Sequence, residues 1–219
     1  MRNFLGFGAV VCVLVFGLSI ASPAQAQKDD WLKGSNDKRW ERIRLTPIDD
    51  LANRVSVIDD PMEIVATLST EPIYQHRQGL LSLVPSDVYL RAFIVKKTGE
   101  VSYQFVLAGS YYGSYETIRR ATYQTSDGPE PADVRQLRHD IGPCTATLGC
   151  RQSFAVAIDV PEDVIQWAST RPRTDNGNWT LRFGASTGDA GNFYMSSSEV
   201  AALLLAVDRY KAISRLVSE

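Results

Sequence analysis

The chain has 219 residues, of which 44% are hydrophobic and 22% charged, a length and composition suited to one ordinary domain with a substantial core. Its formal net charge is −2 and no basic stripe is visible, which argues against nucleic acid or an anionic lipid surface as a partner. The sequence contains no phosphate-binding glycine loop and no histidine pair spaced for zinc, so we expect no cofactor and no metal.

The N-terminus has the organisation of a signal peptide. Arg2 precedes an uncharged apolar run from Phe4 to Ile20, and Ala24 and Ala26 supply the A-x-A spacing that signal peptidase requires. A retained membrane anchor is the alternative, but the run is short for the roughly 20 residues that span a bilayer. We therefore expect residues 1–26 to be removed, leaving a periplasmic or secreted protein without a transmembrane segment.

The next segment is polar. Residues 27–46 carry Trp31 and Trp40 among charged side chains with no clean period, which predicts a flexible N-terminal arm with one helical turn near Trp40. Residues 47–219 are predicted to form a single β-rich domain. Thr46-Pro47 marks the start of a short helix that ends near Asn53.

A central hairpin is predicted from Val88 to Leu107. Two runs rich in β-branched and aromatic residues are separated by a short segment containing Gly99, which can adopt a positive φ. Both faces of the first run carry apolar residues, as in a strand that is covered on both sides.

The remaining elements favour a mainly β fold. Further strands are predicted at residues 63–70, 115–124, 134–141, 153–160 and 179–183. The arginines of segment 134–141 suggest an edge strand. Ser196 and Glu199 form a capping box that opens a C-terminal helix with one apolar face. We therefore expect an antiparallel β-sandwich or curved sheet of roughly seven to nine strands, with the C-terminal helix packed on it.

Of the three cysteines, Cys12 lies in the predicted signal peptide, which leaves Cys144 and Cys150. An even pair in an oxidising compartment predicts a disulfide that closes a small local loop. The alternatives are a redox pair or a metal pair. A redox motif has two intervening residues, and a metal site needs further cysteines or histidines nearby.

Several catalytic motifs match only by chance. Gly184–Gly188 fits G-x-S-x-G, but the residues after it are not helical and no histidine follows His139, so we interpret it as a glycine-rich hairpin loop. Ser35–Lys38 and Lys97–Gly99 match two boxes of penicillin-binding enzymes without the third. A hydrolase in which His139 is the base and Asp140 orients it is the enzymatic alternative.

The best functional feature is aromatic. Tyr111, Tyr112 and Tyr115 cluster with Gly109 and Gly113 at one predicted turn. Flat rings on a rigid loop can stack on a sugar or anchor a protein partner, although such rings can also form ordinary core. The leading hypothesis is an exported, non-enzymatic envelope protein that binds a protein or a glycan through this end. A periplasmic stress or assembly factor is a further possibility.

Two family resemblances accompany these features. The segment Val88–Gln104, the run Tyr111-Tyr112-Gly113, the two cysteines and the helix Val200–Val207 resemble a group of uncharacterised secreted proteobacterial β-sandwich proteins. That resemblance implies an exported sandwich with a Cys-bounded loop and provides no catalytic residue. Gly149-Cys150, ahead of a strand and a helix, is also similar to the invasion-associated locus B family, which is secreted. The second cysteine pair typical of that family is missing from the mature chain.

Overall fold

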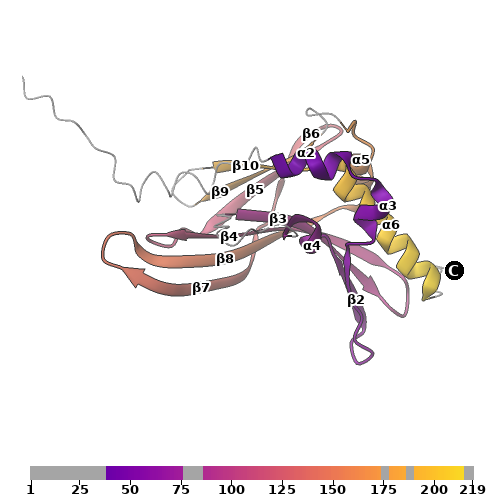
Figure 1. Ribbon diagram of the computed structural model, residues 1–219, viewed down its shortest axis with the longest axis horizontal. Helices are drawn as coiled ribbons and strands as arrows, with labels where there is room; N and C mark the ends of the chain where they lie inside the picture. Colours follow the sequence, from indigo (N-terminus) through magenta and orange to yellow (C-terminus); the bar gives the residue numbers. More distant parts are fainter. Residues whose placement is uncertain (1–37, 76–85, 174–177, 186–189, 215–219) are drawn as a thin grey trace, which may run out of the picture.

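Two antiparallel sheets lie against each other, and a long helix packs on them (Figure 1). The structure, a computed structural model, describes residues 38–75, 86–173, 178–185 and 190–214. The predicted fold class, mainly β with a C-terminal helix packed on the sheets, is confirmed.

The larger sheet has six strands in the order β1-β2-β3-β4-β8-β7. They are β1 (Ser56–Ile58), β2 (Val65–Ser69), β3 (Ser86–Val95), β4 (Val101–Tyr112), β8 (Gly149–Val160) and β7 (Arg135–Thr145). Strands β3 and β4 pair from Ser86–Gly109 to Ile94–Val101, which confirms the central hairpin. Gly99 lies in its turn with φ of 72°, a left-handed conformation that glycine adopts without steric cost.

The smaller sheet has the order β10-β9-β5-β6. Its strands are β10 (Ala190–Met195), β9 (Trp179–Ala185), β5 (Ile118–Thr125) and β6 (Gly128–Ala132). Strand β6 is an edge strand that contains Pro129 and Pro131, and both lie within its ladder with β5. Because they are two residues apart, their nitrogen atoms point the same way, away from β5.

Aromatic side chains join the two sheets. Phe105 of β4 contacts Trp179 edge-on with ring centroids 5.7 Å apart, and it stacks on Phe183 at 6.0 Å. All three rings are fully buried. The indole N–H of Trp179 donates to the carbonyl oxygen of Gln124 at 2.8 Å, so burying this ring leaves its polar atom satisfied.

Five helices complete the described part of the chain: α2 (Lys38–Leu45), α3 (Ile48–Ala52), α4 (Glu71–Gln75), α5 (Glu162–Ser169) and α6 (Ser197–Ile213). Helix α6 buries Val200 and Leu203 in the core. Ser196 is its N-cap, as predicted, and the hydroxyl of Ser196 accepts a hydrogen bond from the backbone N–H of Ser198 at 3.3 Å. In the predicted capping box, the Ser196 hydroxyl would accept a hydrogen bond from the backbone N–H of Glu199 instead.

Part of the predicted N-terminal arm is helical, and it includes Trp40, near which one helical turn was expected. Residues 38–45 of the segment 27–46 form α2, which contacts α6. Ile43 packs against the core, and the carbonyl oxygen of Arg44 accepts a hydrogen bond from the hydroxyl of Ser198 at 3.3 Å. These contacts hold α2 on the domain. The predicted signal peptide, residues 1–26, and residues 27–37 lie outside the described residues.

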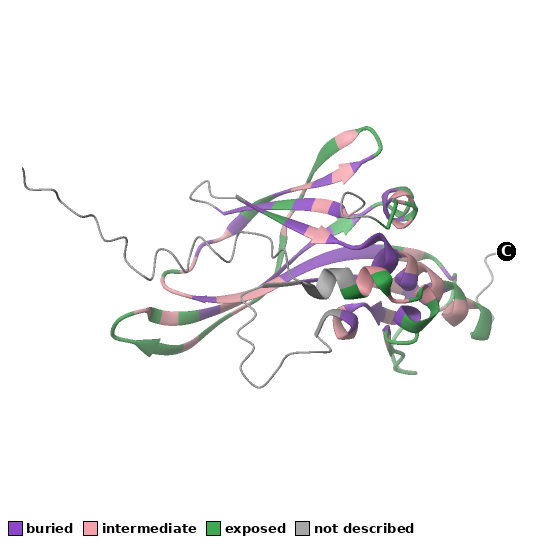
Figure 2. Cartoon of the chain, turned by 45° about the horizontal axis from the view of Figure 1, so that its top comes forward, coloured by how far each residue is buried: buried purple, intermediate pink, exposed green. Residues whose placement is uncertain are grey.

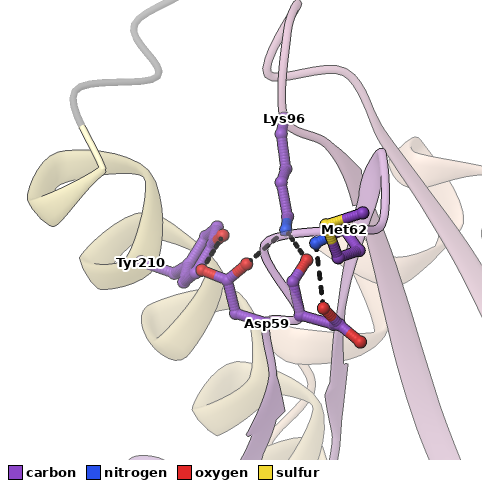
Figure 3. A network of polar contacts seen from close by, with 5 residues as sticks. Asp59, Met62, Lys96 and Tyr210 are labelled. Atoms are coloured by element: carbon purple, nitrogen blue, oxygen red, sulfur yellow. Dashed lines mark hydrogen bonds and ion pairs between the residues drawn. The ribbon is translucent and has the colours of Figure 1, made fainter.

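The β1–β2 hairpin is tied to α6 by a polar network (Figure 3). The carboxylate of Asp59 accepts a hydrogen bond from the hydroxyl of Tyr210 at 2.8 Å and lies 2.5 Å from the ammonium of Lys96. Lys96 also donates to the carbonyl oxygen of Asp60. The hydrogen bonds from Lys96 and Tyr210 hold the pKa of Asp59 below its usual value.

Candidate functional site

Strands β7 and β8 form a long ribbon that extends beyond the rest of the larger sheet (Figure 1). Strand β8 pairs with β4 only as far as Arg151, which lies opposite Tyr112. Nearly every residue of β7 is exposed, and Figure 2 shows that exposure continuing around the tip. Strand β7 is an edge strand, as its sequence predicted.

A disulfide crosslinks the ribbon near its tip. Cys144 and Cys150 lie directly opposite each other in the β7–β8 ladder and form the predicted bond. The sequence predicted a small closed loop, and the structure extends this prediction because both cysteines lie in strands. The bond therefore joins two paired strands, and Gly149, the first residue of β8 after the turn, has φ of 77°.

At the base of the ribbon the ring of Tyr115 stacks on the ring of His139. Their centroids are 3.6 Å apart and their planes differ by 21°. The Nε2 atom of His139 lies 2.9 Å from the amide oxygen of Gln152, and because an amide oxygen only accepts, Nε2 carries the proton. The amide nitrogen of Gln152 donates to the carbonyl oxygen of Gly113 at 3.0 Å. The segment after β4 is thus held against the face of the ribbon that carries Phe154, His139 and Gln152. We call this core-side face the inner face of the ribbon.

Tyr111 is part of the core. Only 3% of its surface is exposed, and its ring contacts Phe154 edge-on at 6.1 Å. Its hydroxyl accepts a hydrogen bond from the backbone N–H of Glu116 at 2.8 Å. Burial raises the pKa of Tyr111 to about 12. This tyrosine therefore positions the segment that carries Tyr115, and it presents no ring face to a partner.

Tyr112 lies on the opposite face. Neighbouring residues of a strand point to opposite sides of the sheet, so Tyr112 faces away from Tyr111 and the core. It is half-buried and pairs in register with Arg151, whose guanidinium donates to the hydroxyl of Ser110 at 3.3 Å. The three predicted site tyrosines therefore occupy three different places. Tyr111 is in the core, Tyr115 stacks on His139 at the inner face of the ribbon, and Tyr112 is on the outer face.

The histidine and the aspartate of the hydrolase alternative do not meet. His139 shares a face with Phe154, its register partner, whereas Asp140 points to the other side. The carboxylate of Asp140 lies 3.0 Å from Nε of Arg138. The other predicted motifs add nothing to this site: residues 186–189 of the G-x-S-x-G match lie outside the described residues, and Lys97–Gly99 lies in the β3–β4 turn.

Two exposed aliphatic residues lie on the same strand as His139, and sequence reasoning missed both. Ile141 is 66% exposed and shares the inner face of the ribbon with Gln152, its register partner. Leu137 is also exposed, at a bulge between Gln136 and Arg138. The signal was present in the sequence, because Leu137 and Ile141 stand among charged and polar residues in a strand predicted to be an edge, where no core requires large aliphatic side chains.

Within the described ranges, no three His, Cys, Asp or Glu side chains come together as a metal site would require. In the same part of the chain, no helix combines the length and apolar character needed to cross a membrane. No family model matches the chain, and neither a curated protein nor a solved structure matches it.

Proposed function

We propose that this chain is an exported, non-enzymatic protein of the cell envelope that binds a protein partner at the ribbon site, which we define as Tyr115, His139 and Ile141. The observation that carries the proposal is the stacked Tyr115–His139 pair beside an exposed isoleucine on a crosslinked ribbon. Aromatic anchors next to aliphatic surface are typical of the centres of protein interfaces.

The ribbon site is held in place before any partner arrives. The side chain of Gln152 bonds His139 on one side and the backbone of Gly113 on the other, so both halves of the ring stack are fixed. The Cys144–Cys150 bond pins the two strands further along the ribbon. Binding at a preorganised surface loses less conformational entropy, which favours affinity.

A protein fits this surface better than a glycan. A sugar stacks on an open ring face, but the ring of Tyr111 is buried and His139 covers one face of Tyr115. The exposed Ile141 and Leu137 favour apolar contacts of the kind that another protein supplies. His139 and Asp140 face opposite sides of β7, so Asp140 does not orient the imidazole as a hydrolase would require.

The disulfide also supports the export part of the proposal, because such bonds persist in oxidising compartments. N-terminal sequencing of the protein from the native envelope is expected to begin at Gln27. An intact Met1 on protein from a cytosolic fraction would contradict export.

The binding proposal is tested by co-purification of tagged, full-length protein from native envelopes. We expect Tyr115→Ala and Ile141→Glu each to reduce recovery of a specific partner about tenfold, because each removes a central anchor. Val57→Ala, which trims an exposed apolar side chain on β1, is the matched control and retains the partner. Recovery that is unchanged by both ribbon variants would refute the proposal. Release by periodate treatment would identify a glycan instead.

A further inference from the structure

A pocket of about 490 Å³ opens at the end of β4 opposite the ribbon site. It lies where the connection from β6 to β7 passes the start of α5, so its walls come from both sheets and one helix. The volume falls within the usual range for small-molecule sites. Because β4 rises about 3.3 Å per residue, Tyr103 at the pocket and Tyr112 near the ribbon are about 30 Å apart. The pocket is therefore separate from the proposed partner site.

The pocket is acidic. Asp133, Asp159 and Glu162 contribute carboxylates from three different segments, and none of the described lining residues is basic. Asp159 pairs with Arg135 on β7, while Glu162 accepts a hydrogen bond from the amide of Gln166 at 3.2 Å. Asp133 forms no ion pair with any described residue. The local field favours a positively charged ligand.

A second and independent feature is the hydroxyl of Tyr103. This residue lines the pocket and is only 4% exposed, yet its hydroxyl forms no hydrogen bond with any residue in the described ranges. The hydroxyl itself is not fully buried and is accessible from the pocket, so a ligand that supplies an N–H can donate a hydrogen bond to it there. Burial and the nearby Glu162 raise the pKa of Tyr103, which keeps the hydroxyl neutral and able to accept.

Apart from Ser102, the rest of the wall is apolar or aromatic. Val101 and Val160 line the pocket together with Tyr123, whose hydroxyl lies 3.4 Å from a carboxylate oxygen of Glu130. Aliphatic walls suit a methylene stem, and a tyrosine ring attracts a cation over its face.

We propose that this pocket binds a small organic cation, namely an aliphatic amine or guanidinium. Its charged end lies between Asp133 and Glu162 and donates a hydrogen bond to the hydroxyl of Tyr103. Its stem lies along Val101 and Val160.

The test is calorimetric titration of the mature protein with 1,6-diaminohexane and with agmatine. The matched neutral probe is 1,6-hexanediol, which has the same stem without charge. We expect both cations to bind, with an affinity that falls as salt rises, and the diol not to bind. Tyr103→Phe is expected to weaken cation binding about tenfold, because a hydrogen bond to a charged group is lost. Asp133→Asn and Glu162→Gln are each expected to weaken it severalfold.

Tyr103→Phe also distinguishes a loss of cation binding from a loss of folded protein. Since the hydroxyl has no partner among the described residues, this variant is expected to unfold at the same denaturant concentration as the wild type, or a higher one. Glu63→Gln, at an exposed carboxylate on the β1–β2 hairpin, is the control and leaves binding unchanged. The proposal is overturned if neither cation binds at 10 mM (about 3 kcal/mol of affinity). Binding that is equally strong in Tyr103→Phe and in the Asp133→Asn/Glu162→Gln double variant would also overturn it.

Discussion

The rings of Tyr115 and His139 lie 3.6 Å apart and nearly parallel, although one follows β4 and the other belongs to β7. This contact joins the crossing from the larger to the smaller sheet with the base of the ribbon. It therefore gives the proposed partner site a measurable role in stability.

The first prediction concerns this stack. Tyr115→Leu removes one ring, and we expect the free energy of unfolding to fall by about 1 kcal/mol, the usual contribution of an aromatic pair. Tyr115→Phe keeps the ring and should stay within about 0.5 kcal/mol of the wild type. Urea denaturation of both variants provides the measurement. Equal stability of Tyr115→Leu and Tyr115→Phe would show that the stack contributes nothing.

The second prediction concerns Tyr111 and alkaline pH. Its pKa is raised to about 12 in the folded protein, chiefly by burial, against about 10 in the unfolded chain. The folded state keeps a proton that the unfolded state has lost. The resulting stabilisation is complete below pH 10 and is lost as pH rises through 12. The free energy of unfolding is expected to fall by on the order of 2 kcal/mol over this pH range.

Tyr111→Phe isolates this effect. At pH 8 the variant is expected to be less stable by about 1–2 kcal/mol, because the backbone N–H of Glu116 loses its acceptor. The difference in stability between the variant and the wild type should then shrink between pH 10 and 11.5, because the wild type loses the stabilisation that comes from the raised pKa of Tyr111. A stability difference that stays constant over that range, in urea titrations at each pH, would contradict the assigned pKa.

The third prediction concerns the disulfide. For so short a closed loop, the chain-entropy estimate is about 2 kcal/mol. Since the crosslinked tip is exposed and extends past β4, we expect the Cys144→Ser/Cys150→Ser variant to loosen the tip first. Hydrogen exchange should accelerate at residues 141–149 and remain unchanged in β3 and β9. Acceleration throughout both sheets would mean that the bond supports the whole fold.

The fourth prediction concerns Asp59. Its pKa is lowered by the hydrogen bond from Lys96 and, to a lesser extent, by the one from Tyr210. Lys96→Met should therefore raise this pKa more than Tyr210→Phe does, as followed by NMR titration of the carboxylate. The stabilisation is present above the unfolded pKa, near 4, and is lost as pH falls through the lower folded pKa. An identical Asp59 titration in all three proteins would show that the network is not formed in solution.

Strand β8 was predictable from its alternation, whereas β1, β6 and β10 were missed. Strand β8 alternates because Phe154 and Val156 enter the core, and that burial leaves a period of two in the sequence. Strand β1 leaves Val57 and Ile58 exposed, so its sequence lacks such a period. Strand β6 was hidden by its two prolines, which indicate a turn unless the strand is known to lie at an edge.

The candidate site was only partly predictable for a related reason. The three tyrosines were grouped at one turn, but β4 continues to Tyr112, so strand alternation separates Tyr111 from Tyr112. The partnership of Tyr115 with His139 depends on β7 pairing with β8, a long-range contact without a local signal. The acidic pocket draws Tyr103, Asp133 and Glu162 from three separate parts of the chain, so no single stretch of sequence revealed it.

The prolines of β6 have one more consequence. A strand from another molecule that adds to this edge would need both N–H donors and carbonyl acceptors from it, and Pro129 and Pro131 have no N–H to donate. A fibre that grows by such strand addition would have to start from a different side of the molecule.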